Sequence, residues 1–152
     1  MLKEILITFF TAMVPVVELR GAIPLGVSLG LSHLGAMVIS VVGNLIPVPF
    51  IILFIREIFS WIRKHIPKLN NLITKIEDRA HVKSEKVLRW SAMGLLIFVA
   101  IPLPGTGAWT GALIAALLNM RLKSAMPAIS LGVLVAGVLV TGITFGFVEI
   151  FT

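Results

Sequence analysis

Two ionisable side chains, Glu18 and Arg20, stand two residues apart in a strongly apolar part of the chain. The 13 residues before them (5–17) and the 12 after them (21–32) carry no charge. A carboxylate in such surroundings is suited to carry a proton, because desolvation favours its neutral form whereas a nearby guanidinium favours its charged form. Ionisable residues at membrane depth are by default candidates for a pathway, although a structural Glu18–Arg20 pair that only fixes a turn is the alternative.

A second unusual stretch, residues 102–111, reads Pro-Leu-Pro-Gly-Thr-Gly-Ala-Trp-Thr-Gly and has no charge. Its three glycines and two prolines exclude a regular helix, and its free amides could hold an anionic group. We expect the two stretches to form one site for substrate and protons. The candidate residues are Glu18, Arg20, Asn44, Pro104, Gly105, Thr106, Gly107, Trp109 and Thr110, with Pro15, Gly21, Pro24, Pro102 and Gly111 shaping the turns.

The composition indicates a single membrane domain over residues 1–152. Hydrophobic residues make up 58% of the chain and the mean hydropathy is +1.06, whereas soluble domains are about 45–50% apolar. The absence of cysteine excludes disulfides and thiolate chemistry. No nucleophile–base pair, metal-ligand spacing or phosphate-binding loop occurs, so we expect neither an enzyme nor a cofactor or metal.

Residues 5–17 and 21–32 would each reach only about 20 Å as helices, which is short of the ~30 Å hydrocarbon core. They therefore predict a re-entrant helical hairpin over residues 5–32, with Glu18 and Arg20 at its polar tip. Residues 90–119 have the same pattern around the second stretch and predict a second re-entrant hairpin.

Two longer uncharged runs, residues 34–55 and 124–148, can each cross the bilayer as a transmembrane helix. Pro47 and Pro49 should bend or break the first of them, and Asn44 could bond a freed carbonyl or touch a polar cavity. Pro127 falls in the first turn of the second run, where proline is tolerated.

Residues 56–89 form a basic connector with nine of the 13 Lys and Arg residues. Apolar residues at helical spacing predict an amphipathic helix lying in the membrane interface, divided at Pro67. Its charge indicates contact with anionic lipid rather than nucleic acid, and the positive-inside rule places it in the cytosol. Both termini are then expected outside the cell.

The order hairpin, span, connector, hairpin, span predicts a duplication, with repeat 1 over residues 1–55 and repeat 2 over residues 90–152. A hairpin crosses the membrane no times and a span once, so the two halves should be inverted. Inverted repeats with broken helices meeting at mid-membrane are typical of secondary transporters. Two spans and two hairpins can enclose only a small part of a transport pathway. We therefore expect a homo-oligomer, with a dimer favoured.

Residues 17–26 (Val-Glu-Leu-Arg-Gly-Ala-Ile-Pro-Leu-Gly) and 102–111 resemble the small multidrug export protein family, a bacterial and archaeal group. The resemblance covers nearly the whole chain and implies the cytoplasmic membrane of a prokaryote. The arrangement is more distantly similar to the DedA/VTT superfamily, which is associated with translocation of lipids such as undecaprenyl phosphate. There, Glu18 corresponds to the membrane carboxylate and Pro104-Gly105 to the turn of the second hairpin, but residues 101–120 lack that group's arginines.

Three functions follow as hypotheses. The first is a secondary exporter, coupled to protons, with its small-molecule substrate between the two tips. The second is a lipid flippase or scramblase of the DedA kind. The third is a membrane assembly protein that transports nothing, in which the hairpins serve only for packing.

Overall fold

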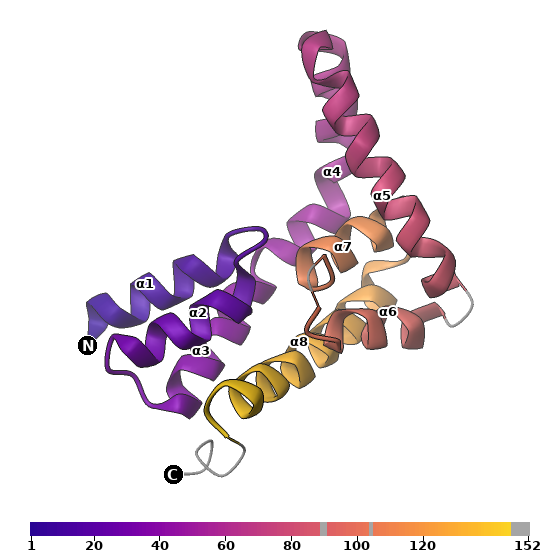
Figure 1. The fold of residues 1–152 in the computed structure, drawn as a ribbon. Helices are drawn as coiled ribbons and strands as arrows, with labels where there is room; N and C mark the ends of the chain where they lie inside the picture. Colours follow the sequence, from indigo (N-terminus) through magenta and orange to yellow (C-terminus); the bar gives the residue numbers. More distant parts are fainter. Residues whose placement is uncertain (89–90, 104, 147–152) are drawn as a thin grey trace.

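The computed structural model describes the backbone of residues 1–88, 91–103 and 105–146, and the side chains of these residues except 80–88 and 91. Within these ranges all regular secondary structure is helical, as predicted. Two segments, His33–His65 and Leu122–Phe145, are long and apolar enough to cross a membrane. The chain is an all-helical membrane protein, and Figure 1 shows a body of packed helices from which one helical arm projects.

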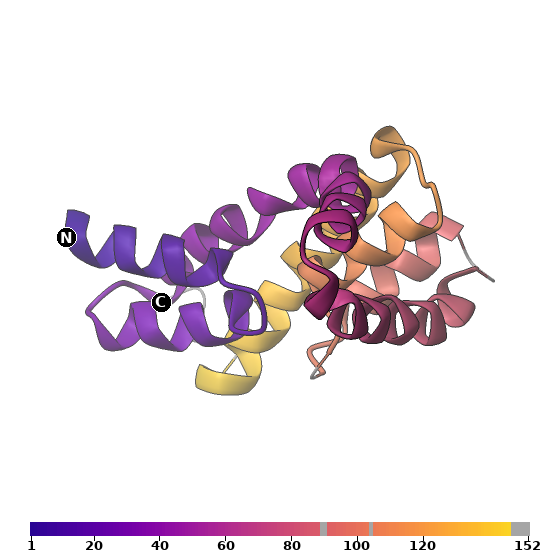
Figure 2. The same ribbon diagram turned by 90° about the horizontal axis from the view of Figure 1, so that it is seen from above.

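The N-terminal apolar residues form a helical hairpin made of α1 (Leu2–Met13) and α2 (Glu18–Ser28) (Figures 1 and 2). The chain leaves α1 at Val14, which is extended with ψ 128°, and Pro15 follows. The helices approach closely where a Cβ added to Gly26 would lie 2.9 Å from the side chain of Thr8. Residues 5–32 are thus two short helices rather than one rod, as the lengths of their apolar runs predict.

The first spanning segment consists of α3 (His33–Leu45) and α4 (Pro47–His65), which are separated at Ile46. The hydroxyl of Ser32 caps α3 by accepting a hydrogen bond from the amide of Gly35 at 3.1 Å. Pro47 lacks an amide proton and therefore begins a new helix instead of continuing α3. The predicted break is confirmed, and α4 continues without interruption to His65, ten residues beyond the predicted end of the span at residue 55.

The arm consists of the second half of α4, the 3-10 turn η1 (Pro67–Leu69) and α5 (Asn70–Leu88). Pro67 divides it as predicted, and an ion pair between Arg63 and Glu77 joins its two helices. The connector expected over residues 56–89 is therefore not a separate surface helix, since its first ten residues belong to α4. Figure 1 shows α4 and α5 running side by side away from the body.

The second half contains α6 (Ser91–Ala100), α7 (Ala108–Leu117) and α8 (Leu122–Phe145). α6 packs along α8, where a Cβ on Gly132 would lie 2.8 Å from the carbonyl oxygen of Leu96. α7 turns away from α6 and packs mainly on α4. The expected second span begins two residues earlier than predicted, and its last two residues lie outside the described part.

The two halves pack together through α4 with α7 and through α3 with α8. A Cβ on Gly137 would lie 2.9 Å from the side chain of Val41, and the rings of His33 and Phe145 have centroids 4.7 Å apart. The start of α3 and the end of α8 therefore lie at the same end of the body, away from the arm. The inversion of the halves, the re-entrant course of the hairpins and their orientation in the membrane stay predictions.

Candidate functional site

The first tip (residues 14–20) is a strained turn that positions Glu18. Val16 has φ 77° and Glu18 has φ 49°, a left-handed region that non-glycine residues rarely adopt and β-branched residues least of all. Val16 is 92% exposed, so packing does not impose this conformation, whereas Glu18 is only 4% exposed. Strained backbone of this kind is concentrated at functional sites.

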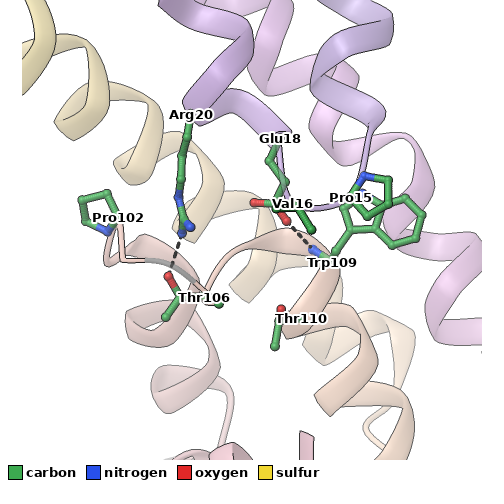
Figure 3. Close-up of a pocket in the computed structure, with 9 residues that line it drawn as sticks. Pro15, Val16, Glu18, Arg20, Pro102, Thr106, Trp109 and Thr110 are labelled. Atoms are coloured by element: carbon green, nitrogen blue, oxygen red, sulfur yellow. Dashed lines mark hydrogen bonds between the residues drawn. The ribbon is translucent and has the colours of Figure 1, made fainter. Parts of the chain in front are cut away.

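The carboxylate of Glu18 caps a helix from the other hairpin. Its Oε1 accepts a hydrogen bond from the amide of Trp109 at 3.1 Å (Figure 3). α7 begins at Ala108, and its own N-cap residue is Gly107, which has no side chain. Glu18 therefore takes the place of an N-cap side chain and lies at the positive end of the helix dipole. Gly107 has φ 121° and lies so close that a Cβ there would overlap the carboxylate.

Arg20 makes a second link between the hairpins. Its Nη2 donates a hydrogen bond to the hydroxyl of Thr106 at 2.6 Å and a longer one to the carbonyl of Ile101 at 3.4 Å (Figure 3). The hydroxyl of Thr106 lies 2.6 Å from the Ile101 carbonyl and 2.7 Å from that of Leu103. Because a hydroxyl has one proton, Thr106 donates to one of these carbonyls at a time while it accepts from Arg20.

The indole of Trp109 adds a third link. Its Nε1 donates to the carbonyl of Met13 at 3.1 Å. Met13 is the last residue of α1, and its carbonyl has no partner within that helix. The end of α1 is thus held by a side chain from α7.

Glu18 and Arg20 make their polar contacts across the interface and not with each other. In the part of the chain that the structure describes, no ion pair joins them, and each bonds to the second tip (residues 101–103 and 105–110). The two side chains are thus not in direct contact in this conformation, and whether they act as a structural pair or as a functional site stays a prediction.

A cavity of about 390 Å³, here named the charged chamber, lies beside these contacts. Both tips line it, and Glu18 and Arg20 are its charged residues (Figure 3). It brings together six of the nine candidate site residues and two of the five candidate turn residues. The lining residues are Pro15, Val16, Glu18, Arg20, Pro102, Gly105, Thr106, Trp109 and Thr110.

A family model described as "Putative small multi-drug export protein" matches residues 18–139, which is well over half of the chain and includes Glu18, Arg20 and the second tip. The chain belongs to the small multi-drug export protein family. The family resemblance inferred from the two sequence stretches is thereby confirmed. No curated protein and no solved structure gives a significant match.

In this member of the small multi-drug export family, a second cavity of about 470 Å³ adjoins the charged chamber. We name it the apolar groove. It shares five lining residues with the chamber and is bounded by α4, α5 and α7, with Arg79 as its charged residue. The sequence analysis missed Arg79 among the nine basic residues of the connector. Its position three residues after Ile76, which lines the same groove, is the signal that it lies on this side of α5.

Asn44 does not line the charged chamber. It is 1% exposed and lies at a narrow void that Glu18, Arg20 and Gly107 also line. Asn44 thus touches the polar site from the side of α3 and α8, through a space too small for a water molecule.

Three of the expected turn residues serve packing instead. Gly21 lies inside α2 against Val17, Pro24 lies within α2, and Gly111 lies in α7, where a Cβ would be 2.5 Å from the side chain of Val99. Pro104 lies outside the described residues. Val16 is the residue of the first tip that the sequence analysis missed, because an apolar residue in an apolar run has no distinguishing pattern.

Proposed function

We propose that this protein is a secondary exporter in which Glu18 carries the coupling proton and the charged chamber binds a small amphipathic substrate. Membership of the small multi-drug export family supports the transport class. The observation that carries the proposal is the position of Glu18. It is a nearly buried carboxylate at the wall of a cavity, and it holds the two hairpins together through the amide of Trp109.

Protonation of Glu18 should loosen this contact. A carboxylate is a strong acceptor for a helix N-terminus, whereas a neutral carboxylic acid loses the attraction to the helix dipole. Proton uptake by Glu18 would therefore weaken the hold of the first tip on α7. Proton binding and movement of the tips are then coupled through one hydrogen bond, which is what a coupled exporter requires.

The two cavities suit an amphipathic molecule. Their volumes of about 390 and 470 Å³ fall within the ~300–1,000 Å³ of ligand-binding pockets. The chamber offers Glu18 and Arg20 to polar groups, while the groove offers Ile51, Ile55 and Phe59 to an apolar body. A molecule with both parts could lie across the shared wall.

Helix lengths support the re-entrant course of the hairpins. α1 has 12 residues and α7 has ten, so they reach only about 18 and 15 Å, and two such tips in contact would meet near the middle of a bilayer. In secondary transporters, the substrate site typically lies where broken helices from opposite faces of the membrane meet. We therefore include the inverted repeat in the proposal.

The test replaces Glu18 by Gln, which can still accept the bond from Trp109 but cannot release a proton. Proteoliposomes containing the pH dye pyranine would receive ethidium as the probe substrate. We expect proton movement in response to ethidium with the wild type and none with Glu18→Gln. Glu57→Gln, which changes an exposed carboxylate on the arm, is the matched control and should behave as the wild type. Normal coupled flux in Glu18→Gln would refute the proposed role of Glu18.

A further inference from the structure

Two buried polar side chains of α3 each have an oxygen atom without a hydrogen-bond partner among the described residues. Ser40 is 0% and Asn44 is 1% exposed, and neither Ser40 Oγ nor Asn44 Oδ1 bonds to any residue that the structure describes. Leaving a buried acceptor or hydroxyl unsatisfied costs about 1–3 kcal/mol. Apolar residues of similar size would stabilise a closed core better, so these two polar groups require an explanation.

The two residues share one face of α3, because they are four positions apart. Asn44 lines the narrow void together with Glu18, Arg20 and Gly107. Glu18 and Arg20 also line the charged chamber. Glu18 thus borders two spaces, the chamber and a void too small for water. Ser40 does not line the void but lies one helical turn beyond Asn44 on α3, toward His33 and away from the arm.

The remaining surroundings of the void are apolar. Besides the four residues named above, it is lined by Leu19, Val99, Ala108, Val133 and Ala136. Arg20 is thus the one other charged residue lining either space among the described residues, and it bonds to Thr106 on the chamber side. Gly107 lies against the Glu18 carboxylate, so the second tip bounds the void on this side.

We propose that Ser40 and Asn44 line the other half of the proton path, which is dry in this conformation and hydrated after the second tip moves away from Glu18. This inference rests on the proposed role of Glu18 as proton carrier. In the other conformation, water held by Asn44 Oδ1 and Ser40 Oγ gives a proton to the carboxylate. In the conformation shown, the carboxylic acid releases that proton to water in the charged chamber, so that the proton moves toward the arm as export requires. Neither side chain changes its own charge, and both unsatisfied atoms gain their missing partners.

The first test separates transport from stability. Ser40→Ala and Asn44→Leu remove the unsatisfied groups, so the midpoint of thermal unfolding in detergent should stay the same or rise by about 2–4 °C. Ethidium-dependent proton flux should fall by roughly tenfold or more, since positioned proton transfer typically contributes ~10²–10⁴-fold. Asn44→Ser keeps an acceptor and should retain part of the flux.

Thr141→Val is the matched control. Thr141 is also 0% exposed, but its hydroxyl already donates to the carbonyl of Gly137 at 2.7 Å. We expect wild-type flux in this variant. Wild-type flux in both Ser40→Ala and Asn44→Leu would overturn the second path, and a loss in Glu18→Gln would then leave the proposed function intact. Absence of coupling in the wild type would overturn both.

A second measurement does not require flux and uses the absence of native cysteine. Ser40→Cys places a thiol at the proposed path with little change in size. Silver ions, which can follow a path wide enough for water, should modify this thiol faster when ethidium and a pH gradient are present than at rest. Modification at the same slow rate under both conditions would overturn the proposal.

Discussion

The first tip and the second tip are both breaks between short apolar helices, but they are built from different residues. The first carries both charges, Glu18 and Arg20, on a backbone that is left-handed at two non-glycine residues. The second is uncharged and uses glycine at its positive φ angles, with φ 80° at Gly105 and φ 121° at Gly107. The first therefore supplies ionisable groups, whereas the second supplies an amide, a hydroxyl and carbonyls at short range.

This difference indicates how a minimal site can hold charges at membrane depth. Each charged side chain of the first tip has a neutral partner on the second tip, namely the Trp109 amide or the Thr106 hydroxyl. A neutral partner can stabilise a carboxylate without fixing it as strongly as a buried cation would. A substitution in either tip should therefore weaken the hydrogen bonds that join the two tips.

The largest effect is expected for Gly107→Ala. The substitution combines a left-handed backbone with a Cβ that overlaps the Glu18 carboxylate, so we expect a loss of about 2–3 kcal/mol in the free energy of unfolding and loss of coupled flux. The measurements are SDS-induced unfolding in micelles and the pyranine assay.

Gly30→Ala is the matched control for Gly107→Ala. Gly30 has φ 99° but nothing within 4 Å of an added Cβ. The substitution therefore adds backbone strain alone, and the free energy of unfolding should fall by about 1–2 kcal/mol. Equal losses in the two variants would show that the contact with Glu18 is not what requires glycine at position 107.

Much of this comparison could be predicted from the sequence, because it depends on local chemistry. The lengths of the apolar runs and Pro15 predict the first hairpin, and Pro47 predicts the break before α4. The end of α4 was missed because Arg56 and Glu57 suggested the end of a span, although charged residues continue a helix as well as apolar ones do.

The contacts of the site could not be predicted, because they join residues far apart in the chain. The Glu18–Trp109 and Arg20–Thr106 bonds span 91 and 86 residues, and no local pattern encodes such pairs. Arg79 was missed for a related reason, since only the packing of α5 against the body distinguishes it from the other basic residues of the arm.

An intermediate effect is expected for the Arg20–Thr106 contact. Arg20→Gln and Thr106→Val each remove one partner of a charge-assisted bond, and a double-mutant cycle should give a coupling energy of about 1–2 kcal/mol in unfolding. Strictly additive effects of the two substitutions would show that the bond does not hold the tips together.

A smaller effect of opposite sign is expected for Val16→Gly. Val16 is 92% exposed at φ 77°, so glycine relieves strain of about 1–2 kcal/mol and loses about 0.5–1 kcal/mol through backbone entropy. The net result is a gain of about 0.5–1 kcal/mol in the free energy of unfolding. Val14→Gly, at a residue with φ −71°, has no strain to relieve and should destabilise. A loss in both variants would mean that the turn at Val16 is not strained.

The smallest effect is expected outside the tips, at Arg63 on the arm. Arg63 bonds to Glu77, which like the partner of Arg20 is distant in sequence. Both side chains of this arm pair are accessible to water, with 42% and 25% exposed. Water replaces such a pair at little cost, so Arg63→Gln should change the free energy of unfolding by less than about 0.5 kcal/mol and leave coupled flux unchanged. A loss as large as that of Arg20→Gln would mean that charge anywhere on the body matters equally. Arg20 would then contribute no more to stability and coupled flux than a solvated arginine does, and the difference between the two tips would not explain transport.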